Sequence, residues 1–495
     1  MKRPAVILAA VVAAAAGVTL FTLRGGDATE PPVPAAGSPI TLQPLSPYVK
    51  VQPGSVELRA APPLRAPRGG SAVLQVLVSP LAGGIPLTAV PSALDGPAAR
   101  IPAAAISVQA ERTVVVRRPS SAVPDGLIGP VPDPLVPPAD ARVGRDGRVV
   151  LYVRIDVARD LPAGRYAGTL AVTAGGRHGT LDLSVEVVDA QISLADGIQT
   201  YFIVWATKAD TAEKRKGASV EYNRILAQGG FGNGIDGSFV DLAGPRQGED
   251  MATAAARLAK AAAAIRAVRP GVQIVSYAYD EPDPSTLPEI RAWGAALKAA
   301  DPQILQLVTS PPRDGLKGAV GILSMHLEQL GEGVPAEVRA LGAVPWTYSS
   351  CCESPGDPTM LLDDRATSTL AVAPATWLQG GRGLLYWGVS VYAHDPWKVA
   401  ANPVDEPAFT GNGDGVLLYP GEPAGLPGPV PSLRLELVRA GLQITALAET
   451  LERRGRGAEA RRILQGVLPG TAQYDHDPAA WEQAESDLLT AVAAP

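Results

Sequence analysis

The sequence predicts an N-terminal β-sandwich followed by a TIM-type (β/α)8 barrel. Between residues 40 and 190, apolar and polar side chains alternate with period two, and turn residues interrupt the pattern every few residues. From residue 195 onward, strands with little alternation take turns with Ala-rich helices. That pattern is typical of a parallel sheet covered by helices. A chain of 495 residues is also long enough for two separate cores.

Residues 40–190 form the predicted sandwich. Residues 149–156 and 179–187 each place apolar side chains on one face, with a further strand at 167–173 between them. Ala174-Gly175-Gly176-Arg177 has the composition of a hairpin turn. No helical stretch interrupts these strands, and two packed sheets would hide one face of each. We expect this domain to support the next one, with carbohydrate binding as the alternative.

Residues 195–430 form the predicted barrel, and residues 431–495 are expected to be helices packed on it. Strands are expected at residues 199–205, 271–277, 303–309, 319–323, 342–346 and 383–387, and helices at 251–268, 287–300, 432–468 and 477–494. This alternation fits a (β/α)8 barrel, with an open doubly wound sheet as the alternative. No Gly-rich phosphate loop follows any strand, which argues against nucleotide binding. Asp477 and Pro478 suit the start of the last helix.

The N-terminus reads as an export segment. Lys2 and Arg3 precede an uncharged apolar run over residues 4–23, which is the order found in signal sequences. The run is long enough to cross a bilayer, so residues 1–24 are interpreted as a membrane anchor in preference to a cleaved signal peptide. Residues 25–39, rich in Pro, Gly and Ala, would be a linker. We therefore expect an exported bacterial-type protein that is periplasmic, on the cell surface or secreted.

Composition excludes several kinds of partner. The net charge is −6 and no stripe of Lys and Arg occurs, so no nucleic-acid partner is expected. The two cysteines, Cys351 and Cys352, are neighbours and cannot form a disulfide framework. A bridge between adjacent residues would be strained, so two reduced thiols are expected. With four histidines and no Cys/His spacing motif, neither a metal nor another cofactor is expected.

The adjacent carboxylates Asp280 and Glu281 are the candidate catalytic residues. They follow the strand predicted at 271–277, and barrel enzymes carry their catalytic groups at such strand ends. Repulsion between two neighbouring carboxylates favours one protonated acid beside one ionised partner. Cleavage of a glycosidic bond needs this division of roles.

Adjacency also constrains the mechanism. Neighbouring side chains on a strand point to opposite faces, so the pair cannot easily flank one bond as nucleophile and acid. A substrate-assisted route avoids the difficulty, because the 2-acetamido group of the sugar attacks while one carboxylate steadies it and the other protonates the leaving oxygen. The same tripeptide recurs at Asp405-Glu406-Pro407, in a Pro-rich loop without a preceding buried strand. We interpret that copy as structural, so the strand context carries the prediction.

The motif Tyr279-Asp280-Glu281-Pro282, with Leu307-Val308-Thr309 downstream, resembles the catalytic domain of glycoside hydrolase family 123, whose members are β-N-acetylgalactosaminidases. Further segments agree in order: residues 346–351, 383–387, 413–421 and 432–442 with the catalytic domain, and residues 132–135 and 160–168 with the β-sandwich that precedes it. The resemblance extends over roughly residues 120–450.

The resemblance implies roles for individual residues. Asp280 would orient the 2-acetamido group and stabilise the oxazolinium ion, and Glu281 would be the general acid and then the base. The implied substrate-binding residues are Tyr279 in the motif, Trp346, Tyr348, Tyr386 and Trp387 as an aromatic platform, and Asp414 and Tyr419 for contacts to sugar hydroxyls. The alternative for each aromatic residue is ordinary packing inside the barrel.

The sequence departs from the family pattern in two places. The family usually has a basic residue close to the tryptophan that corresponds to Trp377, whereas Arg365 lies far upstream of it. Residues 229–234 are unusually rich in glycine where polar sugar contacts would be expected. These departures bear on which sugar is bound more than on the type of reaction.

The resemblance implies retaining, substrate-assisted hydrolysis of terminal β-linked N-acetylhexosamine, with N-acetylgalactosamine as the sugar and a glycan or glycolipid as the substrate. The alternatives are a non-catalytic extracytoplasmic glycan-binding protein and a structural envelope protein of the same fold. A pure binding protein has no need of the paired carboxylates, and a structural protein has no need of the aromatic set.

Overall fold

The computed structural model describes residues 39–494, except residues 57, 195–196, 206–211, 229–230, 232–238, 393, 402–410 and 471–472. The predicted anchor at residues 1–24, nearly all of the predicted linker, the second Asp-Glu-Pro tripeptide and most of the Gly-rich stretch therefore lie outside the described residues. Within the described part of the chain, no helix combines the length and the apolar character needed to span a membrane.

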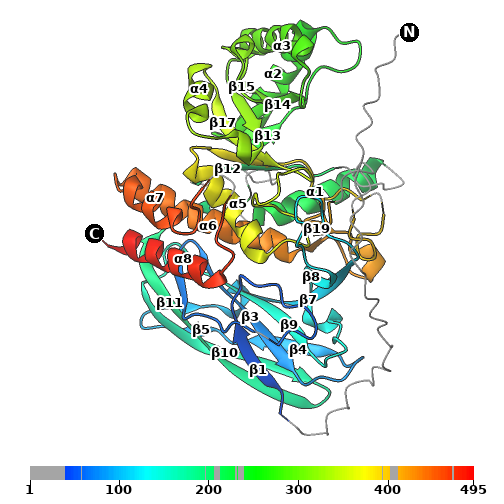
Figure 1. Ribbon diagram of the computed structural model, residues 1–495, viewed down its shortest axis with the longest axis vertical. Coiled ribbons are helices and arrows are strands. Elements are labelled where there is room, and N and C mark those ends of the chain that lie inside the picture. The colour runs from blue at the N-terminus through cyan, green and yellow to red at the C-terminus, as the bar shows by residue number, and fades with distance from the viewer. Residues whose placement is uncertain are drawn as a thin grey trace, which may run out of the picture.

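The N-terminal half consists of two β-sheets, in the lower part of Figure 1. Its strands are β1 (Thr41–Leu45), β2 (Leu64–Arg68), β3 (Ser71–Ser79), β4 (Leu87–Pro91), β5 (Leu94–Asp95), β6 (Arg100–Ile101), β7 (Ile106–Val116), β8 (Gly129–Val136), β9 (Val149–Asp156), β10 (Gly164–Ala174) and β11 (Arg177–Gln191). One sheet has the order β1-β3-β9-β7-β8, and the other has the order β2-β11-β10-β5-β6 with β4 also paired to β10. Side chains from both sheets, such as Val76 and Leu170, share one core. This β-rich half agrees with the predicted sandwich.

Strand β9 explains why the alternation is incomplete in the middle of the first sheet. Leu151 and Val153 point into the core between the two sheets. Tyr152 belongs instead to the core on the other side of the sheet, which is shared with the C-terminal helices. The strand is therefore buried on both faces, and apolar side chains are favoured at consecutive positions.

The second half is built on a seven-stranded parallel sheet. Its strands are β12 (Gln199–Phe202), β13 (Phe239–Asp241), β14 (Gln273–Tyr279), β15 (Ile304–Thr309), β16 (Ile322–Met325), β17 (Val344–Ser349) and β18 (Gly383–Tyr386), in the order β12-β18-β17-β16-β15-β14-β13. The two outermost strands approach each other: the rings of Tyr201 and Phe239 lie 4.9 Å apart, and the Tyr201 hydroxyl donates to Asp241 at 2.8 Å. The sheet is therefore nearly closed.

This sheet corresponds to the predicted barrel only in part. Read as a ring, the strands follow the order of the chain, whereas a doubly wound sheet reverses its order in the middle. Five strands are each followed by a helix. These pairs are β12 with α1 (Ala212–Gln228), β13 with α2 (Met251–Val268), β14 with α3 (Leu287–Ala300), β16 with α4 (Val334–Ala340) and β17 with α5 (Ala366–Leu378). Between β15 and β16 only a 3-10 turn occurs, η5 (Asp314–Leu316). The described residues thus supply seven of the eight strands of a complete (β/α)8 barrel.

The inside of the sheet is filled with side chains. Trp346 is fully buried there and packs against Phe239, with the two rings 5.3 Å apart. Gly383 on the neighbouring strand β18 lies directly over the Trp346 ring, where a Cβ would come within 2.1 Å of it. Glycine at this position therefore allows the large ring to fill the interior.

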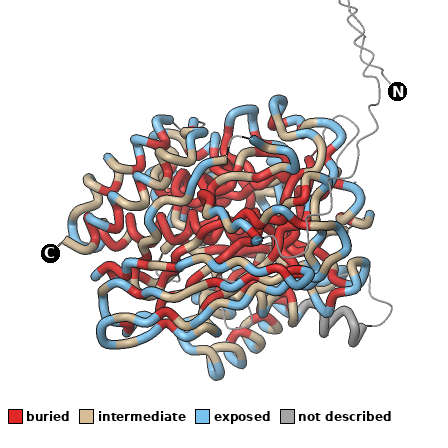
Figure 2. The backbone as a smooth tube through the Cα atoms, turned by 90° about the horizontal axis from the view of Figure 1, so that it is seen from below, coloured by how far each residue is buried: buried red, intermediate tan, exposed pale blue. Residues whose placement is uncertain are grey.

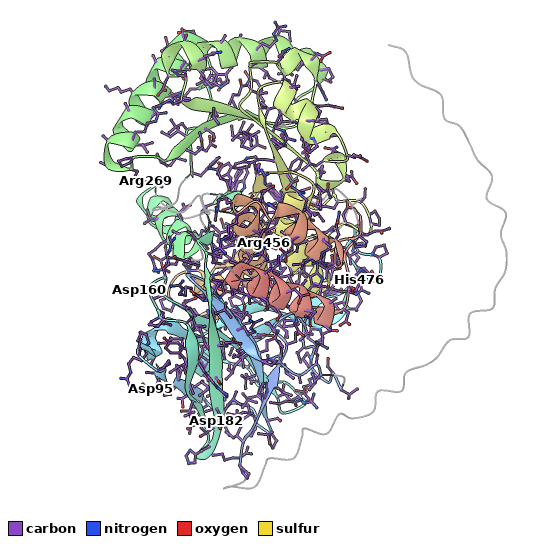
Figure 3. The ribbon with its side chains drawn as sticks, turned by 90° about the vertical axis from the view of Figure 1, so that its left-hand side faces the viewer. Asp95, Asp160, Asp182, Arg269, Arg456 and His476 are labelled. Atoms are coloured by element: carbon purple, nitrogen blue, oxygen red, sulfur yellow. A yellow bond between two sulfur atoms is a disulfide. The ribbon has the colours of Figure 1, made fainter. Side chains whose placement is uncertain are left out.

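The C-terminal helices are α6 (Leu433–Arg453), α7 (Gly457–Gln465) and α8 (Pro478–Ala493). They are predicted to pack on the barrel, but α6 contacts both halves. Its Arg434 pairs with Asp133 of the sandwich at 2.8 Å, and its Glu436 pairs with Arg154 at 2.7 Å. Figure 3 shows these helices, with Arg456 labelled, between the barrel sheet and the sandwich strands. Figure 2 shows the buried residues gathered toward the centre of the molecule, with exposed residues around its rim.

Candidate active site

The candidate site lies at the carboxyl end of β14, where Asp280 and Glu281 follow the last residue of the strand. Both carboxylates are exposed to solvent. Glu281 has a φ of +42°, in the left-handed region that residues other than glycine rarely adopt. The chain therefore turns sharply between the two residues, and the strand rule that sends neighbouring side chains to opposite faces no longer applies.

Thr309, at the end of the neighbouring strand β15, holds this turn. Its hydroxyl donates to Asp280 Oδ1 at 2.8 Å and accepts the backbone N–H of Glu281 at 2.7 Å. One buried hydroxyl thus bonds to both candidate catalytic residues. The Thr309 hydroxyl therefore fixes both the side chain of Asp280 and the backbone of Glu281.

Two tyrosines from the barrel interior complete the cluster. The Tyr277 hydroxyl donates to Asp280 Oδ1 at 2.6 Å, and the Tyr348 hydroxyl donates to Glu281 Oε1. Both rings belong to the apolar cluster inside the sheet, so both carboxylates lie over its carboxyl end. Burial, together with these carboxylate partners, raises the pKa of Tyr277 and Tyr348. Both phenols therefore stay protonated and act as hydrogen-bond donors at neutral pH.

Tyr279 is not part of this cluster. The pairing of β14 with β15 shifts register between Tyr277 and Tyr279, which is the mark of a β-bulge. Tyr277 points into the barrel, whereas the Tyr279 hydroxyl donates to Glu289 of α3 at 3.1 Å on the outer face. The predicted contact of Tyr279 with substrate is therefore not supported by its position.

Among the predicted aromatic platform, Tyr348 lies at the site and Trp346 does not. The ring of Tyr348 is 4.2 Å from that of His326, whose pKa is lowered by burial. Trp346 lies deeper in the same strand, is fully buried and serves as barrel core. For Trp346 this position favours the alternative of ordinary packing.

Tyr386, Trp387 and Asp414 form a second cluster at the carboxyl end of β18. Asp414 Oδ1 accepts the Trp387 indole N–H at 2.9 Å and the Tyr386 hydroxyl at 3.1 Å. Tyr386 and Asp414 are buried, and the hydrogen bond from Trp387 to Asp414 therefore fixes the indole ring to the interior of the molecule. The Trp387 carbonyl in turn accepts the indole N–H of Trp205 at 2.7 Å.

Trp205 is a candidate platform residue that the sequence reasoning missed. It follows β12, and 51% of its surface is exposed, which is unusual for tryptophan. The available signal was its place at the carboxyl end of the strand predicted at residues 199–205.

Tyr419 lies away from both clusters. Its hydroxyl donates to Asp133 at 2.6 Å, beside the buried Arg434 of α6. The residue is fully buried between the two halves of the molecule. The predicted contact of Tyr419 with a sugar hydroxyl is therefore not supported by its position, which favours a structural role.

Glu353 is a further carboxyl group that the sequence reasoning missed. Its Oε1 accepts from the Ser349 hydroxyl and the Ser350 N–H, both at 2.6 Å, while its Oε2 has no hydrogen-bond partner in the described part of the chain. Burial raises the pKa of Glu353 to about 8, and the negative charge of Asp414 adds to the effect. At neutral pH it is therefore mostly a neutral acid that can donate a hydrogen bond.

The two cysteines lie in the loop before Glu353, and the prediction made for them is wrong. Cys351 and Cys352 form a disulfide between adjacent residues, and not the two thiols that were expected.

Arg365 does not lie beside Trp377, and it pairs with Asp125 of the sandwich at 2.7 Å. The guanidinium that lies over the Trp377 ring, at 4.7 Å, comes from Arg461 of α7. In the described residues, no group of three or more potential metal ligands is present.

Comparisons with known proteins bear on the fold of the chain and on part of its second half. Residues 321–451 match the model of the glycoside hydrolase 123 catalytic domain. A family 123 glycoside hydrolase from Clostridium perfringens, solved in a study of glycolipid glycan hydrolysis, has a similar fold with a TM-score of 0.68 at 10% identity, over 92% of this chain and 98% of that one. A β-D-glucuronidase from Dictyoglomus thermophilum is much less similar, with a TM-score of 0.31 at 8% identity over 75% of this chain and 66% of that one. No curated protein matches the sequence.

A nearly closed parallel barrel with two carboxylates at the carboxyl end of one strand is an arrangement found in glycoside hydrolases of the barrel type. The match over residues 321–451 confirms the resemblance to glycoside hydrolase family 123. Asp280 and Glu281 precede the matched range, so their assignment rests on the geometry described above.

Proposed function

We propose that the chain hydrolyses terminal β-linked N-acetylhexosamine, with N-acetylgalactosamine as the sugar, by a substrate-assisted retaining mechanism. One observation carries the proposal: the turn at Glu281 and the hydroxyl of Thr309 bring two adjacent carboxylates to the same end of the barrel. The choice of galactosamine comes from the resemblance to family 123. The seven described strands would belong to a variant of the (β/α)8 barrel, and the substrate would be an extracytoplasmic glycan or glycolipid.

Asp280 suits the role of the orienting carboxylate. Its Oδ1 accepts two hydroxyl hydrogen bonds, from Tyr277 and Thr309, which fix the direction of the group. A fixed carboxylate can accept the N–H of the 2-acetamido group and turn its carbonyl oxygen toward the anomeric carbon. As that oxygen forms the oxazolinium ring, the negative charge of Asp280 stabilises the positive charge that develops.

Glu281 suits the role of general acid and base. As the acetamido oxygen bonds to the anomeric carbon, the glycosidic bond breaks and the leaving oxygen takes the proton of Glu281. Glu281 then removes a proton from water, and the water oxygen bonds to the anomeric carbon. The bond between that carbon and the acetamido oxygen breaks, so the oxazolinium ring opens and the sugar is released with retention of configuration. The hydrogen bond from Tyr348 keeps the Glu281 carboxyl in place through both steps.

The test is turnover of p-nitrophenyl 2-acetamido-2-deoxy-β-galactoside and of the matching β-galactoside, which has a hydroxyl at C2. We expect turnover of the acetamido sugar alone, because the hydroxyl cannot form the oxazolinium ring. Glu281→Gln should lower kcat by about 10² to 10⁴, and less for a better leaving group, because such a group needs less protonation. Asp280→Asn should lower kcat by about 10² to 10³.

Glu289→Gln is the matched control, because Glu289 lies nearby on α3 but bonds to Tyr279 outside the barrel. Its activity should match that of the unsubstituted protein. If a panel of N-acetylhexosaminides is hydrolysed by neither the unsubstituted protein nor Glu281→Gln, the enzymatic proposal fails. Equal turnover of the acetamido and hydroxyl sugars would reject the substrate-assisted route.

A further inference from the structure

A cavity lies between the sandwich and loops of the second half, and neither of the two carboxylates lines it. It has a volume of about 230 Å³ and is lined by strands β7 and β9 and by the segments that carry Gln52, Arg142 and Trp397. Pockets for drug-sized ligands usually measure about 300–1,000 Å³. The cavity therefore suits a ligand no larger than a single sugar unit.

Glu111 of β7 lines this cavity and has no partner for its carboxyl group. Only 7% of the residue is exposed, and neither carboxyl oxygen has a hydrogen-bond partner within the described part of the chain. Burial, together with the negative charge of Asp133, raises the pKa of Glu111 to about 8. Buried polar groups in folded proteins are nearly always hydrogen-bonded, because an unmet group costs about 1–3 kcal/mol. A ligand that occupies the cavity would supply the missing partner.

Arg112 and Arg142 line the same cavity with positive charge. A register shift between Glu111 and Thr113 marks a bulge in β7, and such bulges re-aim side chains, so that Glu111 and its neighbour Arg112 both reach the cavity. Arg112 lies with its guanidinium 4.7 Å from the centre of the Trp397 ring. Burial lowers the pKa of Arg112, and the nearby positive charge of Arg142 lowers it further, although the negative charge of Asp140 partly opposes both effects.

The two guanidinium groups differ from the other cations of the cavity. Arg148 pairs with Asp146 at 3.8 Å, and Lys398 pairs with Asp395 at 3.0 Å. Among the described residues, no such ion pair forms with Arg112 or Arg142. Two guanidinium groups that repel each other beside an open space form a site for an anion, and guanidinium planes match the geometry of a carboxylate.

We propose that this cavity binds one carboxylate-bearing sugar unit, as a second carbohydrate site separate from the catalytic cluster. The sugar carboxylate would lie against Arg112 and Arg142, and the neutral Glu111 acid would exchange hydrogen bonds with a ring hydroxyl. A bare inorganic anion would pair with the two arginines but leave the Glu111 carboxyl group without a hydrogen-bond partner. The sugar could be free or part of a longer acidic glycan. This second site does not depend on the proposed catalytic activity.

Isothermal titration calorimetry on the full chain tests the proposal, with glucuronic acid, N-acetylneuraminic acid, glucose and inorganic phosphate as probes. We expect at least one acidic sugar to bind with a Kd at or below the millimolar range, and glucose not to bind. Arg142→Ala and Glu111→Gln should each raise the Kd at least tenfold. Arg142 is exposed, so its substitution leaves the fold intact. Arg145→Ala is the matched control, because Arg145 is an exposed neighbour outside the cavity lining.

Two outcomes would overturn the proposal. The first is no binding of either acidic sugar, or binding that Arg142→Ala and Arg145→Ala leave equally unchanged. The second is binding of phosphate that neither acidic sugar displaces, which would define an inorganic anion site. Repeating the titration with Glu281→Gln separates this site from the catalytic one, because the affinity should not change in that variant.

Discussion

The backbone of one residue, Glu281, decides how the candidate site can work. In an extended strand its carboxylate would point away from that of Asp280. With φ at +42°, and with its N–H bound to Thr309, the residue turns the pair toward a common space. A non-glycine residue in this region costs about 1–3 kcal/mol and persists where the surroundings enforce it, often at functional sites.

Thr309 is therefore expected to act as a positioning residue. Thr309→Val removes the hydroxyl that bonds to both Asp280 and Glu281, so kcat should fall by about 10² while KM changes little. Steady-state kinetics on the N-acetylgalactosaminide provide the measurement. Thr309→Ser keeps the hydroxyl and should restore most of the rate. Equal loss in both variants would mean that packing of the Thr309 methyl group matters, and not its hydrogen bonds.

The two tyrosines of β14 allow a paired comparison. Tyr277→Phe removes a hydrogen bond to Asp280 and should lower kcat by about two- to tenfold, since one such bond contributes about 0.5–1.5 kcal/mol. Tyr279→Phe removes a hydrogen bond to Glu289 outside the barrel and should leave kcat within twofold. The same kinetic assay measures both. A larger loss in Tyr279→Phe than in Tyr277→Phe would reverse the assignment of inner and outer face.

Sequence reasoning selected Asp280 and Glu281 as candidates from their place after a strand, but it could not orient their neighbours. Tyr277 and Tyr279 have the same parity in a regular strand, and only the bulge between them separates the site residue from the outer one. Thr309 ends β15 and Trp205 follows β12, both distant in sequence from Asp280, and their roles depend on how those strands are arranged in the sheet. Tyr419 was misplaced because its partner, Asp133, lies in the other half of the chain.

At the scale of elements, the sequence predicts the helices more closely than the ends of the strands. Helices α2 and α3 have the bounds expected from their Ala-rich patterns, because helix caps and apolar periodicity are local signals. The helix predicted at 432–468 is instead divided into α6 and α7. Strands β16 and β17 begin and end later than expected, since pairing with neighbouring strands sets their limits. Helix α6 was expected on the barrel alone, because nothing local to it reveals the sandwich residues that it contacts.

The ion pair between Arg434 of α6 and Asp133 of β8 should contribute strongly to stability. Both side chains are fully buried, and Arg434 also donates to the backbone carbonyls of Met360 and Gly413. Asp133→Asn leaves the buried guanidinium charge unpaired, so the free energy of unfolding should fall by about 3–5 kcal/mol. Urea denaturation measures this. Asp95→Asn, which breaks the exposed pair with Arg100, is the control and should cost less than about 1 kcal/mol; equal losses would contradict the assigned role.

At the scale of the whole molecule, two buried acids should give stability a pH dependence. The pKa of Glu111 and that of Glu353 are both raised from 4.5 to about 8 in the folded state by burial. Between these values the folded protein holds protons that the unfolded chain has lost. The stabilisation is therefore complete below about pH 4.5 and is lost as the pH rises toward 8, by up to about 1.4 kcal/mol per pH unit for each group.

Urea unfolding at pH 5, 6, 7 and 8 provides the measurement. The free energy of unfolding of the Glu111→Gln/Glu353→Gln variant should decline less steeply with pH than that of the unsubstituted protein. The two single variants should each remove part of the difference. Identical pH profiles for all four proteins would show that neither acid is protonated in the folded state.

Helix α6 also constrains how such a protein can evolve. Its residues complete the core beneath the barrel and, through Asp133 and Arg154, the outer face of the sandwich. Neither half is therefore a self-contained unit that recombination could move into another gene, because each would leave behind a surface that only the last part of the chain can cover. The two halves and the C-terminal helices must be inherited together, and a useful fragment for expression has to keep all three (Figure 1).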